Sequence, residues 1–138
     1  MLRGLAAIVA GLAAWIIVAT VGNVAVRAAL PGYDEAEASL RATDFGAAQA
    51  SMPFTLAMML ARLLLGAAAS VAAGATCTWI ARTRAAASWI LGIVLVVFFV
   101  PVHIGLWQRF PIWYHLTFLI SLLPCTLLGA AVAARNRR

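Results

Sequence analysis

The sequence predicts an all-α integral membrane protein with four transmembrane helices in an up-down bundle. Hydrophobic residues make up 65 % of the 138 residues and charged residues only 10 %, whereas a soluble domain is about half apolar and a quarter charged. The apolar residues also form continuous runs, and a membrane-spanning helix needs roughly 20 mostly apolar residues. Because a chain of this length cannot hide so much apolar surface from water, we expect lipid to be its solvent.

Four apolar runs predict the spans, and we expect residues 1–138 to form a single domain. The spans are expected at about residues 5–26, 54–80, 87–107 and 112–134. The first run lies between Arg3 and Arg27 and contains no charge, and the second is interrupted only by Arg62. The first run is longer than the apolar core of a signal peptide, so we expect it to be retained as a helix.

The one long connection, residues 31–53, is expected outside the membrane and contains every acidic residue of the chain. Pro31-Gly32 should end the first helix, and Asp34 followed three residues later by Glu37 resembles a capping box at a helix start. A short helix lying on the outer surface and a solvated loop both fit this stretch.

The distribution of arginine predicts the orientation. All ten basic residues are arginine and alanine is abundant, which suggests a GC-rich bacterial genome. Cytoplasmic loops carry an excess of basic residues. With both termini inside, six arginines are cytoplasmic and three are outside. The inner set is Arg3, Arg82, Arg84, Arg135, Arg137 and Arg138, and the outer set is Arg27, Arg41 and Arg109. We therefore expect a multi-pass protein of the bacterial inner (cytoplasmic) membrane, with both ends in the cytoplasm.

Small residues predict how the helices pack. Lipid removes the hydrophobic drive between spans, so close approach depends on small side chains. Gly66, Ser70 and Gly74 follow one another at four-residue spacing in the second span. This pattern supports packing within the chain and equally supports oligomerisation. The third span is bulky and β-branched, which suits a surface that faces lipid or a partner.

Aromatic residues predict where the membrane boundaries lie, because amphipathic rings concentrate at the interface between lipid and water. Trp79 and Trp89 are expected at the inner interface. Trp107, Trp113 and Tyr114 are expected at the outer one.

Each span also carries one polar side chain to the same layer, close to the outer surface. These residues are Asn23, Arg62, His103 and His115. Ionisable residues inside a membrane usually face the bundle interior and indicate a functional site. A static network is the alternative, in which Arg62 extends to the outer headgroups. The sequence leaves both interpretations open.

Enzymatic chemistry is not expected. The sequence shows no nucleophile–base pair, no glycine-rich phosphate loop and no paired catalytic carboxylates, so we assign no catalytic residue. His103 and His115 lie on helices joined by a short turn, which we expect at about 8–10 Å from each other, too close for a porphyrin between them. Cys77 and Cys125 lack metal-ligand spacing. We expect neither a cofactor nor a metal.

Two functions fit these observations. The first is a small non-enzymatic accessory or structural subunit of a homo-oligomer or a larger membrane complex, since the chain is short and rich in small-residue faces. The second is binding or transport of an amphiphilic ligand at an outer-leaflet polar site around Arg62 and His103. A phospholipid, an isoprenoid phosphate or a quinone would suit that site. Nucleic acid is not an expected partner, because arginines anchored at anionic lipid account for the net charge of +6.

Overall fold

The computed structural model describes residues 2–41, 54–82 and 85–136, which are helical and contain no strand. The helices are α1 (Leu2–Ala29), α2 (Tyr33–Arg41), α4 (Leu56–Ala81), α5 (Ala85–Gly105) and α6 (Ile112–Arg135). Four of them, α1, α4, α5 and α6, are long and apolar enough to cross a membrane. The predicted all-α fold with four candidate membrane spans is confirmed.

Local sequence explains where the spans begin. α4 starts directly after Thr55, whose hydroxyl accepts a hydrogen bond of 3.3 Å from the backbone N–H of Met58. This N-cap satisfies one of the donors that a helix start leaves without an intrahelical partner. α6 starts after Pro111, which lacks a backbone N–H and has a fixed φ. The observed bounds lie within a few residues of the predicted spans.

The first part of the predicted outer loop is a helix. Gly32 adopts a φ of 78°, a left-handed conformation that glycine accepts without strain, and the chain reverses direction there into α2. The predicted capping box is wrong, because α2 begins at Tyr33 and Asp34 therefore lies inside it. Starting the helix there buries Tyr33 and Ala36 against Met58 of α4. Residues 42–53 of the predicted loop lie outside the described residues.

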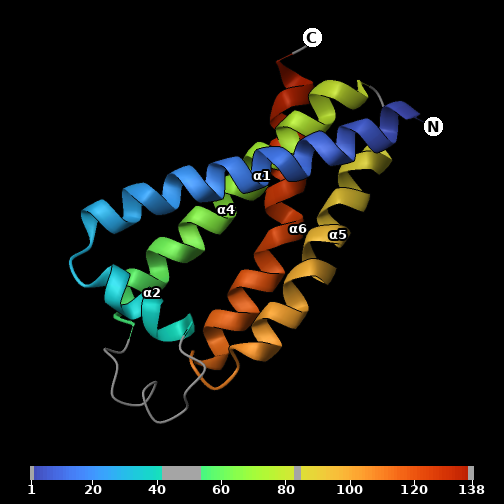
Figure 1. Cartoon of the computed structure of the whole chain (residues 1–138). Coiled ribbons are helices and arrows are strands. Elements are labelled where there is room, and N and C mark those ends of the chain that lie inside the picture. The colour runs from blue at the N-terminus through green and yellow to red at the C-terminus, as the bar shows by residue number, and fades with distance from the viewer. Residues whose placement is uncertain (1, 42–53, 83–84, 137–138) are drawn as a thin grey trace.

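The four long helices are arranged as two pairs. α1 packs along α4 and α5 packs along α6, and the two pairs are joined by the α4–α6 interface, which is more extensive than the one between α5 and α6. Figure 1 shows that the two pairs lie close together at the end of the molecule that holds both termini, and that they separate toward α2. α2 lies at the wide end.

Glycine allows the closest approach between the pairs. A Cβ atom on Gly74 of α4 would lie 1.8 Å from the carbonyl oxygen of Thr126 in α6. A Cβ on Gly129 of α6 would lie 1.9 Å from the carbonyl oxygen of Val71 in α4. The backbones of α4 and α6 therefore touch directly at these two points. Gly66 also faces α6, at Phe118, while the Ser70 hydroxyl accepts a hydrogen bond from Trp15 of α1, so the small-residue face predicted from the sequence packs against α6 and α1 of the same chain.

Replacing Gly74 by alanine should force α4 and α6 apart. We expect Gly74→Ala to lower the free energy of unfolding by about 1–3 kcal/mol, the usual effect of overpacking. Gly4→Ala is the matched control, because a Cβ there meets nothing within 4 Å. The control should be neutral or stabilising by up to about 1 kcal/mol, since alanine favours helix. Denaturation of both variants in detergent, followed by circular dichroism, measures the difference. Equal stabilities for the two variants would contradict the close contact.

Candidate functional site

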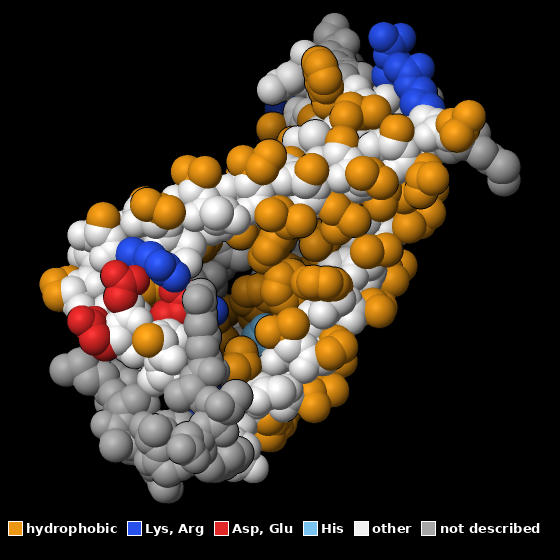
Figure 2. All heavy atoms as spheres, viewed as in Figure 1, with side chains coloured by type: hydrophobic (Ala, Val, Ile, Leu, Met, Phe, Trp, Pro, Cys, Tyr) orange, Lys and Arg blue, Asp and Glu red, His pale blue; other side chains and the backbone are white. Residues whose placement is uncertain are grey.

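A cavity of about 490 Å³ lies where the helix pairs separate. Side chains from α1, α2, α4, α5 and α6 line it. Figure 2 shows the molecule hollowed at this place, with hydrophobic side chains along the edge formed by α5 and charged side chains toward α2. The cavity therefore opens on the side of the bundle, between α1 and α5 (Figure 2). Its rim is apolar along α5 and charged toward α2 (Figure 2).

Tyr33 of α2 organises the charged end of the cavity. Its hydroxyl donates a hydrogen bond of 3.2 Å to Oδ1 of Asn23 and accepts one of 3.1 Å from Nη1 of Arg62. The residue is 1 % exposed. Burial raises the pKa of the Tyr33 phenol above its ordinary value, and the opposing effect of the Arg62 charge is smaller. The phenol therefore stays protonated at neutral pH, as its bond to Asn23 requires.

Two arginines share one carboxylate beside Tyr33. Nη2 of Arg27 donates to Oε2 of Glu37, and Nη1 of Arg62 lies 3.9 Å from Oε1 of the same residue. Asp34 also pairs with Arg27, at 3.4 Å, but its side chain is largely exposed at the rim. The cluster thus holds two positive and two negative charges, with Arg62 and Glu37 as its more buried pair and Arg27 and Asp34 nearer to solvent.

α2 is tied to the bundle from several directions. Tyr33 and Glu37 join it to α1 and α4, and Nη1 of Arg109 donates a hydrogen bond of 2.9 Å to the carbonyl oxygen of Ser39. Arg109 belongs to the turn between α5 and α6. The short helix thus connects the two helix pairs across the wide end of the molecule.

The two histidines form a pair in the wall of the cavity. Nδ1 of His103 lies 2.7 Å from Nδ1 of His115. His103 lines the cavity, whereas His115 lies behind it, 0 % exposed and stacked on Trp107 with ring centroids 5.0 Å apart. Nε2 of His115 has no hydrogen-bond partner among the described residues. Because the two rings are in contact, nothing can lie between them.

Aromatic rings close the other end of the cavity. Nε1 of Trp15 donates a hydrogen bond of 3.2 Å to the hydroxyl of Ser70, which fixes the indole between α1 and α4. The ring of Phe99 lies 4.8 Å from that of Trp15 and 5.2 Å from that of Phe118, centroid to centroid. This end of the cavity is therefore an apolar floor.

The structure brings the four predicted site residues together. Asn23, Arg62 and His103 line one cavity, and His115 contacts His103 from behind. Trp79, Trp89, Trp107 and Trp113 are exposed, between 40 % and 67 %.

Tyr114 is not an exposed interfacial anchor, contrary to the prediction. It is 4 % exposed and lines the cavity. Its ring stacks on Phe110 with centroids 4.6 Å apart, and its hydroxyl interacts electrostatically with Arg62. The turn before α6 folds Phe110 back over the helix start, which buries this tyrosine and exposes its neighbour Trp113.

Sequence reasoning missed Trp15, Arg27, Tyr33 and Glu37 as cavity residues. Two signals were available. Tyr33 and Glu37 are four residues apart and would share one face of a helix. The sequence, however, fitted both a short helix and a solvated loop in this stretch. Trp15 falls in the middle of an apolar span, where an indole N–H needs a hydrogen-bond partner.

Comparison of the chain with protein-family models, with curated proteins and with solved structures finds no match. Within residues 2–41, 54–82 and 85–136, no three histidine, cysteine or acidic side chains gather as metal ligands. The polar groups that line the cavity are arginine, carboxylate, imidazole, amide, hydroxyl and phenol groups, and they lie above an aromatic floor.

Tyr33→Phe should loosen α2 while the ring keeps its edge contact with Phe54. The variant loses the hydrogen bonds to Asn23 and Arg62, and we expect amide hydrogens of α2 to exchange about tenfold faster, the equivalent of one to two hydrogen bonds. Hydrogen exchange read by mass spectrometry measures this rate. Ser121→Ala is the control, because that hydroxyl donates to the carbonyl oxygen of Phe118 in its own helix, and exchange in α2 should stay close to wild type. If both variants left α2 equally protected, Tyr33 would not be the residue that holds it.

Proposed function

We propose that the protein binds an amphiphilic ligand from the outer leaflet, with the head of the ligand at Arg62 and its apolar part on the aromatic floor. The observation that carries the proposal is the cavity itself, which combines charged and apolar ends and opens sideways. Ligand pockets are typically mostly apolar, with a few convergent polar groups that fix orientation. An ionisable side chain within a membrane span is by default a candidate for a functional site.

The floor favours binding over passage through the membrane. Trp15, Phe99 and Phe118 fill the space between the helix pairs below the cavity, and beyond them α4 and α6 touch at Gly74 and Gly129. A ligand that enters sideways would therefore leave by the same route.

We also propose the arrangement predicted from the sequence: an up-down bundle in the bacterial inner membrane with both ends in the cytoplasm. The excess of arginine at that side supports it, and so does the position of both termini at one end of the molecule in Figure 1. The cavity and α2 would then lie at the outer side of the membrane.

Orientation can be tested with single cysteines. Glu35→Cys, at an exposed position of α2, should react with a membrane-impermeant maleimide added to intact spheroplasts. Asn136→Cys should react only after the membrane is permeabilised. The wild-type chain, with Cys77 and Cys125 inside the spans, gives the background. Labelling of Asn136→Cys in intact spheroplasts would contradict the proposed orientation.

Ligand binding can be tested by native mass spectrometry of the protein released from its own membrane. We expect wild type to retain lipid or quinone, and Arg62→Gln to retain about tenfold less, since a hydrogen bond from a charged group contributes about 1.5–3 kcal/mol. Glu37 keeps its contact with Arg27 in this variant, so α2 stays attached. Arg135→Gln is the matched control at the far end of α6 and should bind like wild type.

An accessory or structural subunit is the second candidate function. The outward face of α5 favours it, because bulky apolar side chains such as Ile93, Val97 and Phe98 are exposed there. Lipid would cover the same face. A preparation that carries no small ligand but retains a protein partner in fixed ratio would favour the subunit hypothesis over ligand binding.

A further inference from the structure

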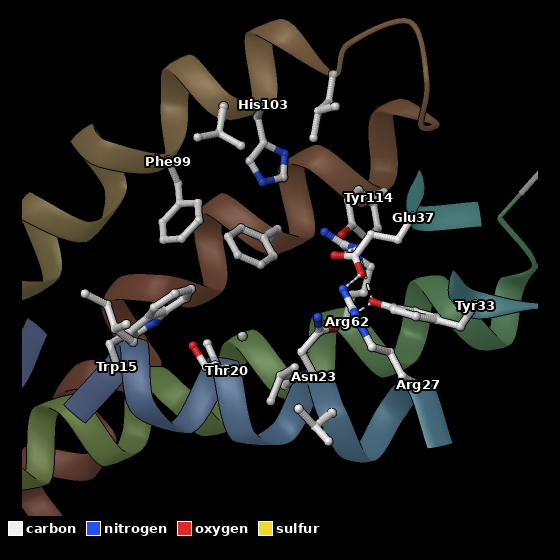
Figure 3. A pocket seen from close by; sticks show the side chains of 18 residues that line it. Trp15, Thr20, Asn23, Arg27, Tyr33, Glu37, Arg62, Phe99, His103 and Tyr114 are labelled. Atoms are coloured by element: carbon white, nitrogen blue, oxygen red, sulfur yellow. Dashed lines mark hydrogen bonds and ion pairs between the residues drawn. The ribbon is translucent and has the colours of Figure 1, made fainter. Parts of the chain in front are cut away.

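The polarity of the cavity changes in three steps along its length. Figure 3 shows Arg62, Glu37 and Tyr33 at one end, Asn23 and His103 in the middle, and Trp15 and Phe99 at the other end. Spacing along α1 gives the same order, since Asn23 lies about 12 Å along the helix from Trp15. The cavity therefore presents a charged layer, then a neutral polar layer, then an apolar layer.

Arg62 brings more hydrogen-bond donors to the charged layer than the described residues accept. A guanidinium carries five N–H donors. The hydrogen bond to Tyr33 and the contact with Glu37 both involve Nη1, and its remaining polar interaction among the described residues is with the Tyr114 hydroxyl. Glu37 lies closer to Arg27 than to Arg62, so its carboxylate compensates the Arg62 charge only in part. A phosphate oxygen matches both the spare donors and this charge.

The neutral layer has a hydrogen-bond donor at His103. The Nδ1–Nδ1 contact requires a proton on one of the two rings. If His103 supplied it, Nε2 of His115 would carry a buried N–H with no acceptor among the described residues, and surveys of backbone groups show that buried donors are left unpaired less often than acceptors. We therefore assign the shared proton to His115. His103 then carries its own proton on Nε2, the nitrogen that faces the cavity in Figure 3.

From these layers we infer that the ligand is a diacyl glycerophospholipid, with its phosphate at Arg62, an ester carbonyl at His103 and an acyl chain on Trp15 and Phe99. This inference rests on the proposed function and narrows it. An isoprenoid phosphate carries no hydrogen-bond acceptor between its phosphate and its hydrocarbon chain, so the Nε2–H of His103 would have no acceptor on the ligand. A quinone carries no charge to match Arg62. A phospholipid presents its acceptors in the same order as the donors of the cavity.

The test compares two lipids that differ only in the ester carbonyls. Delipidated protein in detergent is titrated with dioleoyl phosphatidylglycerol and with its diether analogue, and bound lipid is counted by native mass spectrometry. Wild type should prefer the diester about fivefold, the effect of one neutral hydrogen bond. His103→Phe should bind both lipids equally. Arg62→Gln should bind both about tenfold more weakly and keep the preference.

Two further variants test whether an altered lipid preference could result from misfolding. The double variant His103→Phe/His115→Phe leaves no buried imidazole without a partner, and it should lose the preference as the single variant does. Ser88→Ala, at the opposite end of α5 where the hydroxyl contacts Thr78, should keep both affinity and preference.

The outcomes separate this inference from the function on which it rests. Equal affinity of wild type for the diester and the diether would overturn the phospholipid assignment. Tighter binding of decaprenyl phosphate or of a ubiquinone than of the phospholipid would overturn it as well, while ligand binding itself would stand. If none of these compounds bound saturably, the proposed function would fail.

Discussion

The contact between α4 and α6 at Gly74 and Gly129 is the constraint on which the rest of the molecule depends. In lipid, no hydrophobic driving force brings two apolar helices together. Their association therefore requires a helix surface that packs more closely against another helix than against acyl chains. Direct contact between backbones provides that fit. Away from this contact the ring of Phe118 lies between α6 and Gly66 of α4, and the helix pairs diverge toward α2 (Figure 1). The cavity is a consequence of this divergence.

Divergence would leave Asn23, Arg62 and the histidines facing lipid, where unsatisfied polar groups cost several kcal/mol each. α2 resolves the problem at the charged end, since Tyr33 bonds to two of these groups and Glu37 brings a counter-charge. The histidines pair through one nitrogen of each ring. Among the described residues, N–H groups of Arg62 and the outward nitrogen of His103 are left without a hydrogen-bond partner, and they face the same open space (Figure 3). Both act as donors, which indicates a ligand rich in acceptor oxygens.

Much of this architecture could be predicted from the sequence, because a membrane span is recognised from hydrophobicity summed over about 20 residues. That sum changes little when single residues differ. The layer that contains Asn23, Arg62, His103 and His115 followed from counting residues along helices. Tyr33 and Tyr114 could not be assigned in the same way. Whether a tyrosine at the end of a span faces the interface or the interior depends on the turn beside it, at Gly32 for Tyr33 and at Phe110 for Tyr114. Those turns are tertiary features that periodicity does not encode.

The central claim is that the helix pairs enclose a cavity, charged toward α2 and apolar toward Trp15, that opens to lipid between α1 and α5. An experimental structure of the protein in a lipid nanodisc tests it most directly. We expect elongated density with its head beside Arg62 and its tail along Trp15 and Phe99. A structure in which α1 packs against α5 along its whole length, with Arg62 extended into the outer headgroups and no space beside His103, would contradict the account.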